Sequence, residues 1–199
     1  MISGPTFARE LAEGKPAAIT LATNNIHSPD VLAKQMSNKS LRVYLSDDPI
    51  GVQLGGGLKN IIAVAAGVSD ALKMGANARA ALVTRGLSEI KLLGKKLGGD
   101  EKTFMGLSGM GDLMLSCTDD QSRNRLLGLS IGKGLSFKEA TTQQNSVPEG
   151  AHAIKTLVEK SIVTDEQPIM FAVYQILYGG FDVNKIAEEL MLRPIKGEL

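Results

Sequence analysis

The sequence has few of the residues from which disulfide-linked or metal-bound folds are built. It contains one cysteine, Cys117, and two histidines, His27 and His152. One thiol excludes an internal disulfide, and one thiol with two imidazoles falls short of the usual ligand set of a structural zinc site. We therefore expect no metal site and assign structural roles to these three side chains.

Net charge and long apolar runs are also lacking. Lys and Arg total 22 against 21 Asp and Glu in 199 residues, so no net field draws the chain to nucleic acid or to a lipid surface. No apolar run approaches the roughly 20 residues that cross a bilayer, and the start lacks a charged and then apolar signal pattern. We expect a cytoplasmic protein with no nucleic-acid partner and no membrane insertion.

The first 46 residues read as a short α/β unit. Residues 5–12 and 28–36 predict helices, and residues 17–22 and 41–45 predict strands because apolar, β-branched and aromatic residues gather there. Two strands do not form a stable sheet alone. We therefore expect residues 1–46 to be mobile, swapped or paired with another chain, and easier to open than the rest.

After residue 46 the strand signals fade and amphipathic segments follow one another. The spacing of apolar residues predicts a mainly α fold, with a helical domain over 47–199. The expected helices cover residues 48–73, 77–97, 100–105, 112–117, 123–132, 137–142, 149–160, 168–178 and 183–190.

Lys59 stands on the first of these helices among glycines and alanines. Gly55, Gly56, Ile62 and Ala63 lie one turn away, so a ligand can approach closely and the ammonium loses part of its water. Loss of water favours the neutral amine, which suits a general base or acid. The alternative is a helix whose glycines allow tight packing while Lys59 extends to solvent.

Two further segments carry polar groups suited to ligand binding. Ser122, Arg123 and Asn124 begin a helix, where free N–H groups and a guanidinium favour an anion such as phosphate; a solvated first turn is the alternative. Asp112 follows a glycine pair and either caps a helix or, as a site residue, orients Lys59 or accepts a hydrogen bond from a substrate hydroxyl. The segment Val147–Gly150 is explained by helix capping alone.

Five ordered segments together resemble the bacterial-type NAD(P)-dependent glycerol-3-phosphate dehydrogenases. They are Ser3–Ala8, Gly57–Asn60, Gly111–Leu113, Ser122–Arg125 and Val147–Gly150. The resemblance covers essentially the whole chain. It implies the C-terminal part of such an enzyme: an all-helical substrate domain, preceded over residues 1–46 by a remnant of a Rossmann domain. Most of that domain, including the G-x-G-x-x-G pattern absent here, is expected to be missing.

The resemblance also implies roles for individual residues. Lys59 is the expected catalytic acid and base on sn-glycerol 3-phosphate. The substrate-binding residues it implies are Gly4, Thr6, Lys59, Asp112, Ser122, Arg123 and Asn124. The residues it implies for the NAD or NADP cofactor are Ala8, Arg123, Val147 and Glu149.

The implied reaction interconverts glycerol 3-phosphate and dihydroxyacetone phosphate for phospholipid synthesis. We expect a homodimer, and the isolated chain to be nearly inactive. Two alternatives remain open: a helical assembly module without activity, and a related hydroxyacid dehydrogenase. Enzymes of the latter kind usually carry an asparagine one turn after the lysine, where this chain has Ala63.

Overall fold

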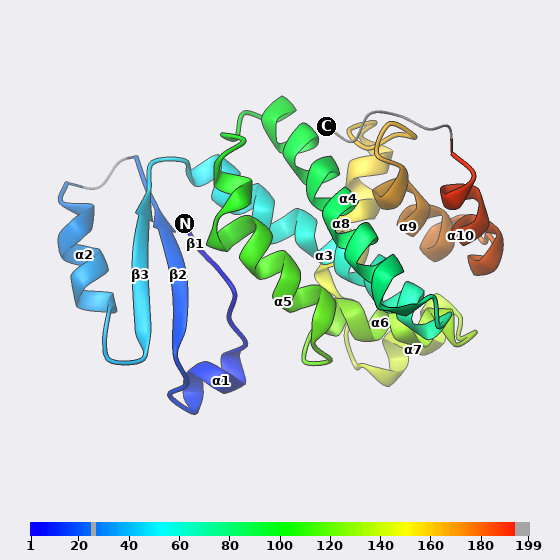
Figure 1. Ribbon diagram of the computed structural model, residues 1–199, viewed down its shortest axis with the longest axis horizontal. Helices are drawn as coiled ribbons and strands as arrows, with labels where there is room; N and C mark the ends of the chain where they lie inside the picture. Colours follow the sequence, from blue (N-terminus) through cyan, green and yellow to red (C-terminus); the bar gives the residue numbers. More distant parts are fainter. Residues whose placement is uncertain (25–26, 194–199) are drawn as a thin grey trace.

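The computed structural model describes residues 1–24 and 27–193, which form a small sheet unit beside a larger helical part (Figure 1). Among these residues the sheet has the strand order β1 (Ile2–Ser3), β2 (Ala17–Ala22) and β3 (Leu41–Ser46). β2 pairs antiparallel with β1 and parallel with β3. The two longer strands lie where the sequence predicts them. β1 was not predicted, because a two-residue strand has no alternation of its own and is defined only by its pairing with Leu21 and Thr20.

Two short helices complete the sheet unit. α2 (Pro29–Met36) contacts β3, and α1 (Ala8–Ala12) follows β1 after an extended segment. α1 therefore begins three residues later than predicted. Pro5 lies in the extended segment, where Gly111 of the helical part lies against its ring.

The helical part is built around α3 (Pro49–Ala71), which runs through the middle of the molecule (Figure 1). Asp48 caps its start by accepting a hydrogen bond from the Gly51 N–H at 2.8 Å. α3 contacts the other main helices, and its residues Ile61, Ile62 and Ala63 are fully buried. By length and composition α3 is apolar enough to cross a membrane, which corrects the expectation that no run has this property. Here it forms the core around which the other helices pack.

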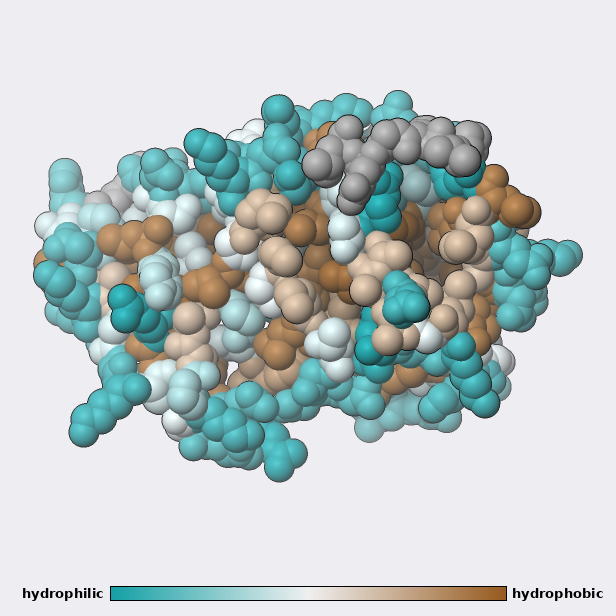
Figure 2. All heavy atoms as spheres, in the orientation of Figure 1, coloured by the Kyte–Doolittle hydropathy of each residue, from teal (hydrophilic) through white to brown (hydrophobic). Residues whose placement is uncertain are grey.

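The remaining helices follow the predicted order, with ends shifted by at most two residues. They are α4 (Gly75–Lys96), α5 (Asp112–Thr118), α6 (Arg123–Gly132), α7 (Phe137–Gln143), α8 (Glu149–Glu159), α9 (Pro168–Tyr178) and α10 (Val183–Met191). The helix predicted over 100–105 is reduced to one 3₁₀ turn, η1 (Thr103–Met105), and an unpredicted π-helical segment, η2 (Leu107–Gly111), leads into α5. On the face seen in Figure 2, hydrophilic side chains border the molecule and apolar ones gather in its middle.

Glycines set how closely α3 approaches α6. A Cβ on Gly67 would lie 2.1 Å from the Arg125 carbonyl oxygen, and one on Gly128 would lie 2.0 Å from that of Val64. Both contacts are with backbone, so the two helices can touch only where side chains are absent. This crossing brings Arg125, in the first turn of α6, against Gly67 on α3.

Candidate active site

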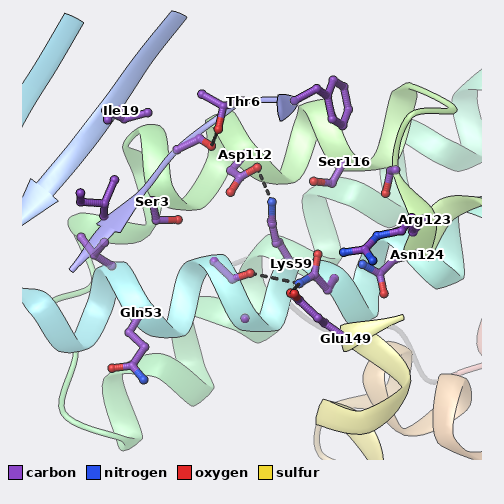
Figure 3. Close-up of a pocket in the computed structure, with 18 of the residues that line it drawn as sticks. Ser3, Thr6, Ile19, Gln53, Lys59, Asp112, Ser116, Arg123, Asn124 and Glu149 are labelled. Carbon is purple, nitrogen blue, oxygen red and sulfur yellow. Dashed lines mark hydrogen bonds and ion pairs between the residues drawn. The ribbon is translucent and has the colours of Figure 1, made fainter. Parts of the chain in front are cut away.

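A pocket of about 490 Å³ lies where the sheet unit meets the helical part. It is lined by β1 and the segment after it, and by residues of α3, α5, α6 and α8. Figure 3 shows Lys59 in its middle, with Asp112 above it and Arg123 and Asn124 to one side. Segments far apart in the sequence thus converge on one hollow.

Lys59 and Asp112 form an ion pair inside this pocket. The Lys59 ammonium donates a hydrogen bond to Asp112 Oδ1, and their side chains are 16% and 5% exposed. Burial raises the pKa of Asp112 above its usual range, while the charge and hydrogen bond of Lys59 and a hydrogen bond with Ser116 oppose the rise. The amine is therefore held at a fixed point and shielded from bulk water.

The first turn of α6 forms a second, cationic end of the pocket. Ser122 caps the helix by accepting from the Arg125 N–H at 3.3 Å. Within residues 1–24 and 27–193, the Arg123 guanidinium makes no side-chain hydrogen bond or ion pair. A free guanidinium beside the positive end of a helix attracts an anion, and phosphate matches its planar fork.

Two hydrogen bonds connect α3, α6 and α8 at the floor of the pocket. Asn60 Nδ2 donates to Glu149 Oε2 at 3.1 Å, and the Gly150 N–H donates to Asn124 Oδ1 at 2.8 Å. Gly150 permits this approach, because a Cβ there would lie 2.6 Å from the Asn60 carbonyl oxygen. The amide of Asn124 and the carboxylate of Glu149 are therefore fixed relative to Lys59.

The segment between β1 and α1 closes the pocket on the side of the sheet. Gly4 packs on β2 so tightly that a Cβ would lie 2.9 Å from the Ile19 Cα. The Thr6 hydroxyl donates to the Gly4 carbonyl at 3.3 Å within this segment. The sheet unit therefore supplies backbone and small polar groups to the wall facing Lys59.

Eight of the residues singled out from the sequence line this one pocket. They are Gly4, Thr6, Lys59, Asp112, Ser122, Arg123, Asn124 and Glu149. Ala8 and Val147 do not line it: Ala8 lies at the exposed start of α1, and Val147 is 40% exposed ahead of α8. The lining also includes Gln53, Asn60 and Ser116, which sequence reasoning did not select. The one feature of the sequence that could have pointed to Asn60 is its position next to Lys59.

The glycines around Lys59 divide into two kinds. Gly55 packs on η2, where a Cβ would lie 2.5 Å from the Ser108 carbonyl oxygen, so it serves packing rather than ligand approach. Gly56 and Gly57 line the pocket, and a Cβ on Gly57 would meet no atom within 4 Å. The sequence argument for close ligand approach therefore applies to Gly56 and Gly57 and fails for Gly55.

The cysteine and histidines lie apart from this chemistry. Cys117 is buried, and burial raises the pKa of its thiol to about 12, so it stays protonated. His27 and His152 are exposed rather than part of the core. In the described part of the chain, no three His, Cys, Asp or Glu side chains gather as a metal site would require.

A protein-family model and curated relatives of this chain point to the same family. The protein-family model described as the NAD-dependent glycerol-3-phosphate dehydrogenase C-terminus matches residues 48–188 of this chain. The chain is 50% identical over 200 residues to a glycerol-3-phosphate dehydrogenase [NAD(P)+] of Tolumonas auensis, and 48% identical over 203 residues to that of Bartonella tribocorum. In both comparisons it covers 100% of its own length and 60% of the relative's.

A solved structure gives the same result. The crystal structure of glycerol-3-phosphate dehydrogenase from Coxiella burnetii superposes with a TM-score of 0.89 at 43% identity, over 96% of this chain and 59% of that one. By sequence and by fold, this chain belongs to the NAD-dependent glycerol-3-phosphate dehydrogenase family and corresponds to that family's C-terminal domain.

Proposed function

We propose that this chain forms the substrate side of the active site of an NAD(P)-dependent oxidoreductase that interconverts sn-glycerol 3-phosphate and dihydroxyacetone phosphate. The observation that carries the proposal is the pairing, in one pocket, of a shielded amine with a free guanidinium: Lys59 held by Asp112, and Arg123 at the start of α6. A phosphate ester of a small polyol needs both groups, one for its charge and one for its hydroxyl.

The phosphate end binds at α6 in this proposal. Arg123 and the first-turn N–H groups receive the phosphate oxygens, and Ser122 and Asn124 contact the ester and the glycerol hydroxyls. The volume of about 490 Å³ holds such a small molecule with space to spare. Catalysis follows from orientation, because the bound phosphate brings C2 of the substrate to Lys59.

Lys59 moves the proton. During oxidation Lys59 acts as the neutral amine, whose Nζ lone pair accepts the proton of the C2 hydroxyl, and during reduction of dihydroxyacetone phosphate the ammonium donates that proton to the oxygen on C2. Asp112 accepts a hydrogen bond from Nζ, which fixes its direction and compensates its charge. Asp112 thus acts as the partner that orients the acid.

The remaining space in the pocket suits the nicotinamide end of NAD or NADP. Glu149 and Arg123 would hold it, with Thr6 and the Gly4 backbone on the opposite wall. The nicotinamide supplies the hydride acceptor or donor when it is bound. The sequence carries no G-x-G-x-x-G pattern, so the rest of the dinucleotide needs groups beyond those of this chain. Ala8 and Val147 are proposed to contact the cofactor outside the pocket lining.

The proposal extends to partners and location: a cytoplasmic homodimer that serves glycerophospholipid synthesis, without nucleic-acid partners or membrane insertion. A second copy finds apolar surface at the end of α10, where Met191 is 76% and Leu192 is 83% exposed. Balanced charge gives no attraction to polyanions. Light scattering tests the dimer, and a dehydrogenase assay separates an enzyme from an assembly module without activity.

The direct test of the site is calorimetric titration of the chain with sn-glycerol 3-phosphate. We expect binding by the unmodified chain, a loss of at least about tenfold in affinity in Arg123→Met, and a smaller loss in Lys59→Met, because the phosphate carries most of the charge. Glycerol without phosphate is the control ligand and should bind far more weakly. Equal affinity of the Arg123→Met variant for glycerol 3-phosphate would refute the assignment of the phosphate site.

A further inference from the structure

A second arginine, Arg125, lies two residues after Arg123. Unlike the free guanidinium of Arg123, its guanidinium is hydrogen-bonded within the protein. Arg125 is 8% exposed, and its guanidinium has three acceptors. Its Nε donates to Asp120 Oδ1 at 2.9 Å, and its Nη1 donates to Asp70 Oδ2 and, at 3.2 Å, to the Cys117 carbonyl oxygen. All three contacts of this guanidinium are internal, so it is not available to a ligand.

The three acceptors come from three different elements. Cys117 lies in the last turn of α5, Asp120 lies in the turn between α5 and α6, and Asp70 lies near the end of α3. The guanidinium therefore fixes the turn that leads into Ser122 and ties it to the central helix. Asp70 is itself held from α4 by Arg79, whose Nη1 lies 2.9 and 2.8 Å from the two carboxylate oxygens.

The same contacts decide which charges lie beside the pocket. Asp120 is three residues from Arg123, and its side chain is 68% exposed. A carboxylate so placed is a natural partner for Arg123 and would compete with an anionic ligand. Because Arg125 holds Asp120, Arg123 remains unpaired among the described residues. The Arg125 guanidinium thus both holds the Asp120 carboxylate and fixes the turn before α6.

We infer that Arg125 is a positioning residue for anion binding: it fixes the turn before α6 and captures Asp120, which leaves Arg123 and the first turn of α6 aimed into the pocket. This inference rests on the proposed phosphate site. Arg125 itself touches no ligand. The guanidinium suits this role because the acceptors lie around two of its nitrogens, Nε and Nη1, whereas a lysine offers all its donors from one nitrogen.

The test compares two conservative substitutions on either side of Asp70. Arg125→Lys keeps the charge and removes the fork, whereas Arg79→Lys disturbs the same carboxylate from the side away from the pocket. Each variant is titrated by calorimetry with sn-glycerol 3-phosphate and with inorganic phosphate, well below its melting temperature, which is measured separately. We expect both to lower the melting temperature, Arg125→Lys to weaken binding by about tenfold, and Arg79→Lys to leave binding within about twofold of the unmodified chain.

A third variant tests the same inference, because charge repulsion and loss of positioning predict opposite changes in its affinity for the anion. Asp120→Asn removes a negative charge near the anion site, so charge repulsion alone predicts tighter binding. The inference predicts weaker binding, because the neutral amide oxygen of asparagine accepts from Arg125 Nε less strongly than the carboxylate does and so holds the turn less firmly. Asp120 is exposed, so this variant is expected to fold even if Arg125→Lys does not.

The outcomes separate the inference from the proposed function. If Arg125→Lys and Arg79→Lys change affinity equally, or if Asp120→Asn binds as tightly as the unmodified chain or more so, the positioning role is wrong and the phosphate site stands. If Arg123→Met binds both anions like the unmodified chain, the phosphate site itself is wrong and the inference falls with it.

Discussion

Lys59 and Asp112 lie 53 residues apart in the sequence and form an ion pair in which both side chains are largely shielded from water. α3 supplies the lysine, and the carboxylate is the first residue of α5. Breaking one half of such a pair leaves an uncompensated charge in a desolvated place, which typically costs about 3 kcal/mol. Substitutions in this pair therefore test the charge of Asp112, the stability of the fold and the proposed role of Lys59 together.

The first prediction concerns the charge of Asp112. Burial already raises the pKa of Asp112 and Lys59 opposes the rise, so Lys59→Met should raise the pKa of Asp112 further. Because this folded pKa then lies further above the unfolded value, the variant should lose stability relative to the unmodified chain as pH rises above the ordinary aspartate range. Carboxyl ¹³C NMR titration measures the shift. The double variant Lys59→Met, Asp112→Asn should recover part of the stability, and an unchanged Asp112 titration would contradict the pairing.

The second prediction concerns the crossing of α3 and α6. In Gly67→Ala the new Cβ would meet the Arg125 carbonyl oxygen at 2.1 Å, so the helices must separate, at a cost of about 3 kcal/mol in the free energy of unfolding. Gly57→Ala on the same helix is the matched control. Its Cβ meets nothing within 4 Å, so helix propensity should increase stability by up to about 1 kcal/mol. Urea unfolding of both variants gives the comparison, and similar effects in the two would refute the packing role.

The third prediction concerns Glu89, a buried carboxylate on α4 that accepts hydrogen bonds from the Ile169 and Met170 N–H groups at 2.8 and 3.0 Å. Burial raises the pKa of Glu89 to about 7, against these two hydrogen bonds and the charges of Arg85 and Arg193. The folded chain then holds a proton that the unfolded chain has released, so stability should fall by up to about 3 kcal/mol as pH rises from 4.5 to about 7.

Replacement of Glu89 should remove this dependence. Urea unfolding at several pH values should show the decline in the unmodified chain and in Glu188→Gln, which changes an exposed carboxylate on α10. Glu89→Gln should flatten it, because the amide has no proton to lose in this range. A decline of the same size in Glu89→Gln would assign it to other groups.

The fourth prediction concerns the sheet unit. In the described residues β3 pairs with β2 alone, so one edge of β3 keeps backbone groups without a strand partner. Amide hydrogens of β3 should therefore exchange much faster than those in the middle of α3, where Ile61 to Ala63 are fully buried. Hydrogen exchange followed by mass spectrometry tests this. Uniform protection across residues 1–46 and α3 would show that the sheet unit is as stable as the helical core.

The helices were predictable because each carries its own periodicity and boundary residues. α9 begins and ends as predicted, since Pro168 opens it and Gly179 follows its last residue. β1 and η2 were not predictable from local pattern. β1 is defined by its partners on β2, and η2 is packed so closely between α3 and η1 that Gly109 lies against the Phe104 backbone.

The candidate site was predictable where residue type alone signals chemistry, as for Lys59, Asp112 and Arg123. Asn60, Ser116 and Arg125 gave little signal, because their importance depends on partners distant in sequence: Asn60 reaches Glu149, and Arg125 reaches Asp70. The sequence places Arg123 and Arg125 in one motif. Only the fold separates them into a free guanidinium that faces the pocket and a buried one that supports it.

The most direct measurement is a crystal structure of the chain with sn-glycerol 3-phosphate bound. We expect the phosphate at the first turn of α6, within hydrogen-bond distance of the Arg123 guanidinium, and the C2 hydroxyl against Lys59 Nζ, with Asp112 still paired to that nitrogen. A phosphate bound elsewhere, or a C2 hydroxyl turned away from Lys59, would contradict this arrangement.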